Sequence, residues 1–136
     1  MAKVSGLGEV ITVADSGGTA RTISNDITNW SMSTPRGVQD TTGVNSSANE
    51  RILLLADYSI TLSGVFNAAA NNSHDVFKTV SSTSVNRAVS VQATSTGSTM
   101  ATNSIFSDYQ LTRANSGELT WQAPGSLADG AVPTWT

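Results

Sequence analysis

The sequence predicts a mainly all-β fold, a β-sandwich or barrel of about seven or eight strands with one short α-helix on its flank. Three observations predict it. Twenty serines and eighteen threonines dominate the polar composition, and these residues favour turns and strands respectively. Several short segments alternate apolar and polar residues, as strands with one buried face do. Only one segment has the spacing of an amphipathic helix.

Composition sets further bounds on the chain. Its 136 residues fit a single domain, and without cysteine the sequence offers no disulfide, thiol nucleophile or thiolate metal site. Only 12% of residues are charged, about half the usual share, so the surface lacks the repulsion that keeps proteins monomeric. The net charge is −3 and the seven basic residues are scattered, which argues against tight binding to nucleic-acid phosphates.

The N-terminal part predicts three strands. Residues 9–14 (EVITVA) and 19–24 flank an Asp-Ser-Gly-Gly turn and form a plausible hairpin. Residues 27–33 (ITNWSMS) follow as a third strand, with Trp30 and Met32 on the same side.

The alternation of apolar and polar residues stops between residues 34 and 49, where Pro35, Gly37 and Gly43 predict a long loop. A loop of this length is more than a simple connection within a compact domain. Residues 50–57 (ERILLLAD) form an apolar patch that could be a strand, or a helical turn followed by a strand.

The clearest strand is residues 58–67 (YSITLSGVFN), in which Tyr58, Ile60 and Leu62 point to one face. The helix candidate is residues 73–80 (SHDVFKTV), with Asn72 or Ser73 as its cap and an acidic residue in its first turn. Its apolar face consists of Val76, Phe77 and Val80. About two turns long, it needs a sheet to lie on.

Two more strands and a hairpin complete the chain. Residues 85–93 alternate again, and residues 103–113 predict one long strand whose common face is Ile105, Tyr109 and Leu111. An Asn-Ser-Gly turn leads to residues 118–123 (ELTWQA), which pair back on that strand. The remaining tail carries prolines and a tryptophan, Trp135, that needs a packing site.

No catalytic, metal or cofactor site is predicted, so the sequence argues against an enzyme. Ser73, His74 and Asp75 contain the letters of a catalytic triad, but consecutive helical residues cannot form its hydrogen bonds. His74 is the sole histidine, and the carboxylates match no calcium-loop pattern. The aromatics fall at strand spacing with aliphatic companions and are expected in the core: Tyr58, Phe66, Phe106, Tyr109 and Trp121.

Four segments follow one another over most of the chain: residues 23–43 (ISNDITNWSMSTPRGVQDTTG), 48–67 (ANERILLLADYSITLSGVFN), 73–91 (SHDVFKTVSSTSVNRAVSV) and 106–136 (FSDYQLTRANSGELTWQAPGSLADGAVPTWT). In number and order they resemble siphophage major tail tube proteins, the short type of phages of actinobacteria. The resemblance implies a β-sandwich or half-barrel with a flanking helix, a fold that looks shared with type VI secretion tubes and the inner tubes of contractile phages.

What the resemblance implies about function is structural. Six copies would close into a ring, rings would stack into a hollow tube, and DNA would pass through it during ejection without specific binding. The partners implied are other copies of the chain, a tail-length ruler (tape measure) protein, a tail terminator and tail chaperones, with no cofactor. The protein would belong to the virion tail and be assembled in the host cytoplasm.

The same resemblance places contacts with neighbouring copies in two segments, the loop at 34–49 and a C-terminal arm at 125–136. Our hypothesis is that polar contacts between rings or subunits come from Arg36, Asp40, Glu50 and Arg51. Val132 and Trp135 on the C-terminal arm would add apolar contacts.

Export signals bear on the alternatives. The first ten residues have no apolar stretch of signal-peptide length, and the longest aliphatic run, residues 52–56, predicts no membrane anchor. A β-sandwich carbohydrate-binding module would be expected to carry an export signal and exposed aromatics. Another virion component, a head decoration or tail-terminator protein, and a cytoplasmic interaction module remain open.

Overall fold

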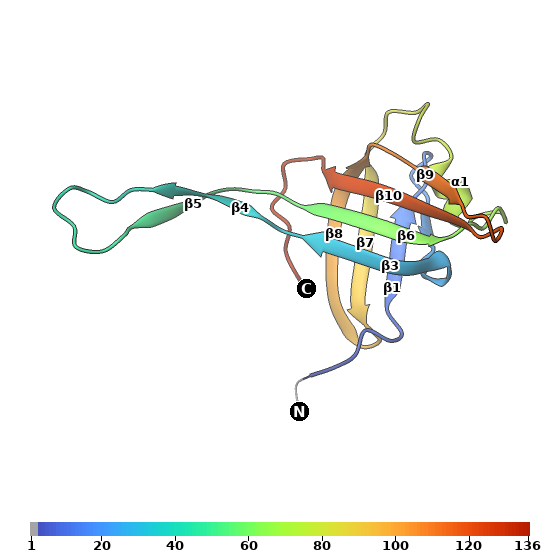
Figure 1. Ribbon diagram of the computed structural model, residues 1–136, viewed down its shortest axis with the longest axis horizontal. Coiled ribbons are helices and arrows are strands. Elements are labelled where there is room, and N and C mark those ends of the chain that lie inside the picture. Colours follow the sequence, from blue (N-terminus) through green and yellow to red (C-terminus); the bar gives the residue numbers. More distant parts are fainter. Residues whose placement is uncertain (1–2) are drawn as a thin grey trace.

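The computed structural model describes residues 3–136, which form an antiparallel β-structure with one short α-helix and one 3-10 helix (Figure 1). Its strands are β1 (Val10–Ala14), β2 (Ala20–Thr22), β3 (Ile27–Ser33), β4 (Arg36–Asp40), β5 (Arg51–Ala56), β6 (Ser59–Val65), β7 (Arg87–Thr94), β8 (Gly97–Phe106), β9 (Gln110–Arg113) and β10 (Leu119–Leu127). The helices are η1 (Ser24–Asp26) and α1 (Ser73–Phe77).

One sheet of eight strands makes both layers of the domain. Its order is β2-β1-β7-β8-β10-β6-β3, with β9 paired to β10. β8 pairs with β7 along most of its length but with β10 only through Ser104–Phe106, so the sheet turns at that corner. Strands β3, β6 and β10 therefore cross over β1, β7 and β8 (Figure 1). The prediction of a β-sandwich or half-barrel with one flanking helix is confirmed.

The core lies between the two layers and is formed by strand residues that alternate with outward ones. The predicted inward face of β6 is confirmed, because Tyr58, Ile60 and Leu62 are fully buried. Trp121 on the neighbouring β10 is buried too, and its indole Nε1 donates a hydrogen bond to the backbone oxygen of Val65 at 3.0 Å. Phe106 is also buried as expected.

Helix α1 closes one end of the sandwich through an aromatic cluster. The ring centroid of Phe77 lies 5.1 Å from that of Phe106 and 5.2 Å from that of Trp121. Tyr109 stacks on Phe77 at 5.7 Å but is only half-buried, as is Phe66. Aromatic pairs at such distances add stabilisation beyond the burial of their area.

Asn72, one of the two expected caps, is the N-cap residue of this helix, but the expected length was wrong. α1 ends at Phe77, and the residues to Ser82 continue as turns instead of a second helical turn. Neither Asn72 nor Ser73 caps it with a side chain. A buried carboxylate does so instead: Asp26 Oδ2 accepts the backbone N–H of Ser73 at 3.1 Å, while Oδ1 accepts the amide of Asn67 at 2.8 Å. A carboxyl oxygen is a common acceptor for the free N–H groups at a helix N-terminus.

The predicted strand at 103–113 was also wrong. Strand β8 ends at Phe106, and β9 begins only at Gln110. Ile105 is 47% exposed instead of sharing a buried face with Tyr109, because an interruption of the strand shifts the side-chain alternation that a continuous strand would keep.

Strand β10 is longer than expected, since it continues through Pro124 and Gly125 to Leu127. Pro124 lies between the residues that pair with β9 and those that pair with β8. A missing N–H is tolerated at such a change of partner.

Residues 36–40, expected within a loop, form β4, which pairs with β5 in a separate two-stranded sheet. The register shifts between Arg36 and Val38, where Leu54 and Leu55 of β5 lie opposite Gly37 alone, so the bulge is on β5. This segment is therefore an irregular hairpin and not a structureless loop.

Candidate interaction surfaces

The most prominent surface is a β-hairpin that projects from the domain. We call residues 34–57 the arm; it contains β4, β5 and the loop between them. It extends from the end of the β3–β6 layer, opposite to α1 (Figure 1). Six large apolar side chains on it are at least 42% exposed: Val38, Val44, Ile52, Leu53, Leu54 and Leu55. Monomeric proteins seldom expose so many large apolar groups together, so the arm has the character of an interface.

All four charged residues expected to make contacts lie on the arm. The guanidinium of Arg36 donates two hydrogen bonds to the backbone oxygen of Leu54, at 3.0 Å from Nε and 2.8 Å from Nη2. Asp40 lies opposite Arg51 in the β4–β5 ladder. The hydroxyl and backbone N–H of Thr42 hold the pKa of Asp40 below its ordinary value.

These charged groups can still form ion pairs and hydrogen bonds with a partner. Over residues 3–136 the ion pairs are Arg21–Asp15 and Lys78–Asp75, both outside the arm. Arg36 uses only part of its five N–H donors on Leu54. Charges at the edge of an apolar patch are typical of an interface rim.

A second surface is formed by the C-terminal segment after β10. The expected C-terminal arm began at residue 125, but Gly125–Leu127 belong to β10. Beyond them, Thr136 exchanges two backbone hydrogen bonds with Thr99, at 2.9 and 3.0 Å. Trp135 forms a β-bridge with Met100 and stays 51% exposed. The tail therefore lies along β8 and leaves part of an indole free.

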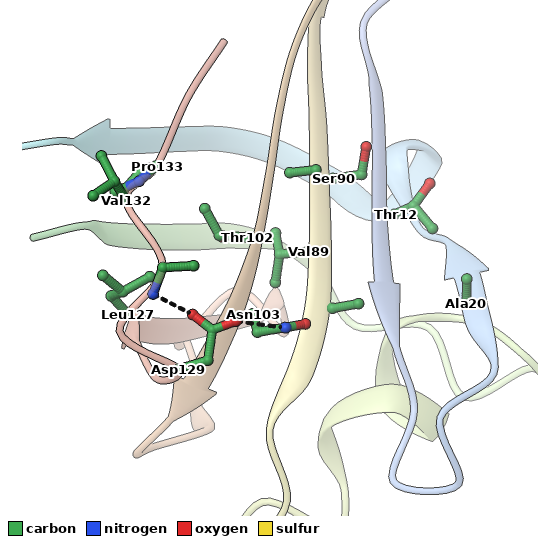
Figure 2. Close-up of a pocket in the computed structure, with 13 residues that line it drawn as sticks. Thr12, Ala20, Val89, Ser90, Thr102, Asn103, Leu127, Asp129, Val132 and Pro133 are labelled. Atoms are coloured by element: carbon green, nitrogen blue, oxygen red, sulfur yellow. Dashed lines mark hydrogen bonds between the residues drawn. The ribbon is translucent and has the colours of Figure 1, made fainter. Parts of the chain in front are cut away.

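This segment borders a shallow groove of about 330 Å³ on the outward side of β7 and β8 (Figure 2). Val132 and Pro133 line one wall. Asp129 is the ionisable side chain among the lining residues, and it accepts hydrogen bonds from Asn103 Nδ2 at 2.7 Å and from the N–H of Ala131 at 3.0 Å. Those bonds hold the pKa of Asp129 below its ordinary value. One engaged carboxylate provides no acid–base pair, so the groove suits binding more than catalysis.

Both layers turn uncharged side chains outward. On the β3–β6–β10 layer the registers place Ser31, Ser33, Ser59, Thr61, Ser63, Thr120, Gln122 and Ser126 on that face. On the other layer they place Thr12, Thr22, Ala88, Ser90, Gln92, Thr99, Ala101 and Asn103 outward. Exposed sheet faces of soluble domains usually carry lysine or glutamate. These faces can therefore pack against another protein without burying an ion.

Ser73, His74 and Asp75 do not form a catalytic triad. His74 Nδ1 lies 3.2 Å from the hydroxyl of Tyr109, Asp75 bonds Lys78 at 2.8 Å, and the buried hydroxyl of Ser73 has no partner. No three His, Cys, Asp or Glu side chains within residues 3–136 gather as metal ligands. The helices in that range are too short to span a bilayer.

Sequence reasoning placed the charged residues of the arm but missed its apolar ones. A signal was present: residues 52–55 read ILLL without the polar alternation of a half-buried strand. Sequence analysis left open whether that patch is a strand or a helical turn followed by a strand, and periodicity does not report what lies above a strand.

Comparison with known proteins rests on structure, because no family model and no curated protein matches this sequence. One solved chain comes from the tail of an empty gene transfer agent particle, determined with C6 symmetry. It superposes with a TM-score of 0.72 at 17% identity, covering 98% of this chain and 99% of that one. The two chains share one fold. A chain from the virion of a native gene transfer agent particle superposes with a TM-score of 0.69 at 17% identity over the same shares.

The likeness to the gene transfer agent chains extends over nearly the whole length of this chain. The predicted resemblance to tail proteins is confirmed at the level of the fold.

Proposed function

We propose that this protein is the structural subunit of a tail tube, in which six copies close into a ring and rings stack into a hollow conduit for DNA. The observation that carries the proposal is the fold shared over 98% of the chain with a protein of a C6-symmetric gene transfer agent tail. The protein acts by self-assembly, catalyses nothing and uses no cofactor. Its place is the virion tail, after assembly in the host cytoplasm.

Ring closure uses the open edges of the large sheet. β2 and β3 are the end strands of the sheet order, so each leaves a row of backbone groups without a strand partner within residues 3–136. Unpaired strand edges promote pairing between copies, and a head-to-tail contact repeated by rotation closes a ring. The low charge of the chain leaves little repulsion to oppose this packing.

Stacking uses the arm at 34–57 and the C-terminal segment. Arg36, Asp40, Glu50 and Arg51 make polar contacts with neighbouring copies, and Val132 and Trp135 add apolar ones. The exposed apolar residues of the arm and the half-exposed indole support this assignment.

DNA passes through the tube without adhesion. Binding duplex DNA requires several lysines or arginines that neutralise phosphates together. The outward sheet faces carry hydroxyl, amide and methyl groups, and the chain has a net charge of −3. A tail-length ruler protein, a tail terminator and tail chaperones are the further partners.

The test is electron microscopy of the purified protein in negative stain at increasing concentration. We expect long hollow tubes with sixfold symmetry in end-on views. Isolated rings that never stack would favour a tail terminator, and a monomer at every concentration and salt would overturn the proposal. Binding of that monomer to a glycan array would favour a carbohydrate-binding module.

Charge reversal on the arm tests the polar contacts. Arg36→Glu should reduce tube formation by about fivefold, since one exposed charge contact contributes about 1 kcal/mol or less. Pelleted protein at fixed concentration measures the effect. Lys3→Glu, which changes the net charge equally at an exposed N-terminal residue, is the control. Tubes of unchanged length and stability in the Arg36 variant would remove the contact from the proposal.

A further inference from the structure

We propose that the arm is a wedge whose two faces pack against two different copies of this chain, an inference that rests on the proposed tube function. Val38 and Leu53 form one face of the wedge, and Ile52 and Leu54 form the other. The inference goes beyond the polar contacts expected from the sequence, because it makes apolar packing on both sides of the ribbon the main contribution of the arm.

The ladder between β4 and β5 assigns the faces. Val38 and Leu53 are directly opposite each other, so their side chains share one face of the ribbon. Gln39 and Ile52 form the next pair and therefore point to the other face. Leu54 joins Ile52 on that face. Gly37 precedes Val38, so a Cβ built on Gly37 would point away from the face of Val38, and it would lie 3.4 Å from Leu54 Cδ1. Leu55, at the bulge, is 90% exposed and belongs to neither assignment.

The domain does not cover either face. The arm projects away from the sandwich, and β4 and β5 form a sheet of their own (Figure 1). A two-stranded ribbon has no interior, so all four side chains remain at least 42% exposed. Hairpins of this kind are marginal in water without a covering surface. Apolar residues on one face would require one covering surface, but apolar residues on both faces require two.

Copies of the same chain provide suitable surfaces. The outward faces of both sheet layers present small uncharged groups such as Ser31, Thr61, Ser90 and Ala101. Leucine packed on such a face leaves no buried ion, whereas packing on a charged surface would. The two faces also differ at their borders: Asp40 and Arg51 lie beside Val38 and Leu53, whereas Gln39 pairs with Ile52 and Glu50 continues that face. The two covering surfaces therefore need not be the same part of the partner.

A serine scan tests whether both faces are used. The variants are Val38→Ser with Leu53→Ser for one face and Ile52→Ser with Leu54→Ser for the other. Each pair should reduce the pelleted fraction at fixed concentration by at least about tenfold, because burial of these groups drives association. Val4→Ser, at an exposed valine in the N-terminal segment, is the control. The melting temperature of the unassembled subunits should stay unchanged. Wild-type assembly by either face variant would overturn the wedge.

Cross-linking tests whether two copies are touched. The chain contains no cysteine, so Leu53→Cys and Ile52→Cys each introduce a single site for a photoreactive maleimide. A small fraction of labelled subunit is assembled into excess wild-type tubes and irradiated. Each single label should give dimers, and the doubly labelled chain should also give trimers. Dimers alone from the double label, within well-formed tubes, would overturn the wedge and leave the tube function intact. Absence of wild-type tubes would overturn the tube function itself.

Discussion

Trp121→Ala should lower the free energy of unfolding of the unassembled subunit by about 3–5 kcal/mol, as truncation of a large buried aromatic does. Trp121 is 2% exposed and its ring meets Phe77 and Tyr109 at the end of the sandwich. The substitution empties the space between β10 and α1. It also removes the indole donor that bonds the backbone oxygen of Val65. Because such domains are stable by only about 5–15 kcal/mol, much of the stability would be lost.

Urea denaturation gives the free energy of unfolding. It is followed by a circular dichroism signal that does not depend on tryptophan. Leu111→Ala is the matched control, since Leu111 faces Trp121 across the β9–β10 ladder but is 45% exposed. We expect the control to cost less than about 1 kcal/mol, as most surface substitutions do. If the two variants were equally stable, the aromatic cluster would not be the main packing contact at this end of the domain.

Gly64→Ala should cost about 3 kcal/mol or more and reduce the yield of folded protein, because the new methyl group meets backbone and not a flexible side chain. A Cβ at residue 64 would lie 1.8 Å from the backbone oxygen of Asp26 and 3.0 Å from the Cα of Ile27. Relief requires β3 to move away from β6 at the bulge between Ile27 and Asn29. That movement would also displace the carboxylate that caps α1.

The measurement is the thermal unfolding midpoint of the soluble fraction, with Gly17→Ala as the control. A Cβ at Gly17 meets only Asp15 Oδ1, at the ordinary contact distance of 3.4 Å. The control should therefore unfold within a few degrees of the wild type. If Gly64→Ala had the same thermal unfolding midpoint as Gly17→Ala, β3 and β6 would not be held as closely as the structure indicates.

Residue patterns predicted the elements whose information is local. Alternation from Tyr58 to Gly64 was sufficient to place β6 and its buried face, and the Asp-Ser-Gly-Gly turn was sufficient to place the first hairpin. These predictions succeed because side chains of a strand alternate regardless of what the strand pairs with. Arg36 and Asp40 were assigned to a loop but lie in β4, and their contacts with neighbouring copies stay a prediction.

Other features depend on contacts between distant residues. The carboxylate of Asp26 caps a helix 47 residues further along the chain, and no local pattern distinguishes it from an exposed aspartate. Ile105 faces outward, against expectation, because the strand is interrupted at the corner of the sheet, where β8 passes from β7 to β10.

The sequence by itself determined that this chain is a lightly charged β-protein with one flanking helix and without a recognisable catalytic centre. Only the tertiary structure decided which apolar residues lie inside. Residues 52–55 are as apolar as any core strand, yet they lie on an arm with no layer above them. The physical reason is that burial is a property of two surfaces brought together, and local periodicity describes only one of them.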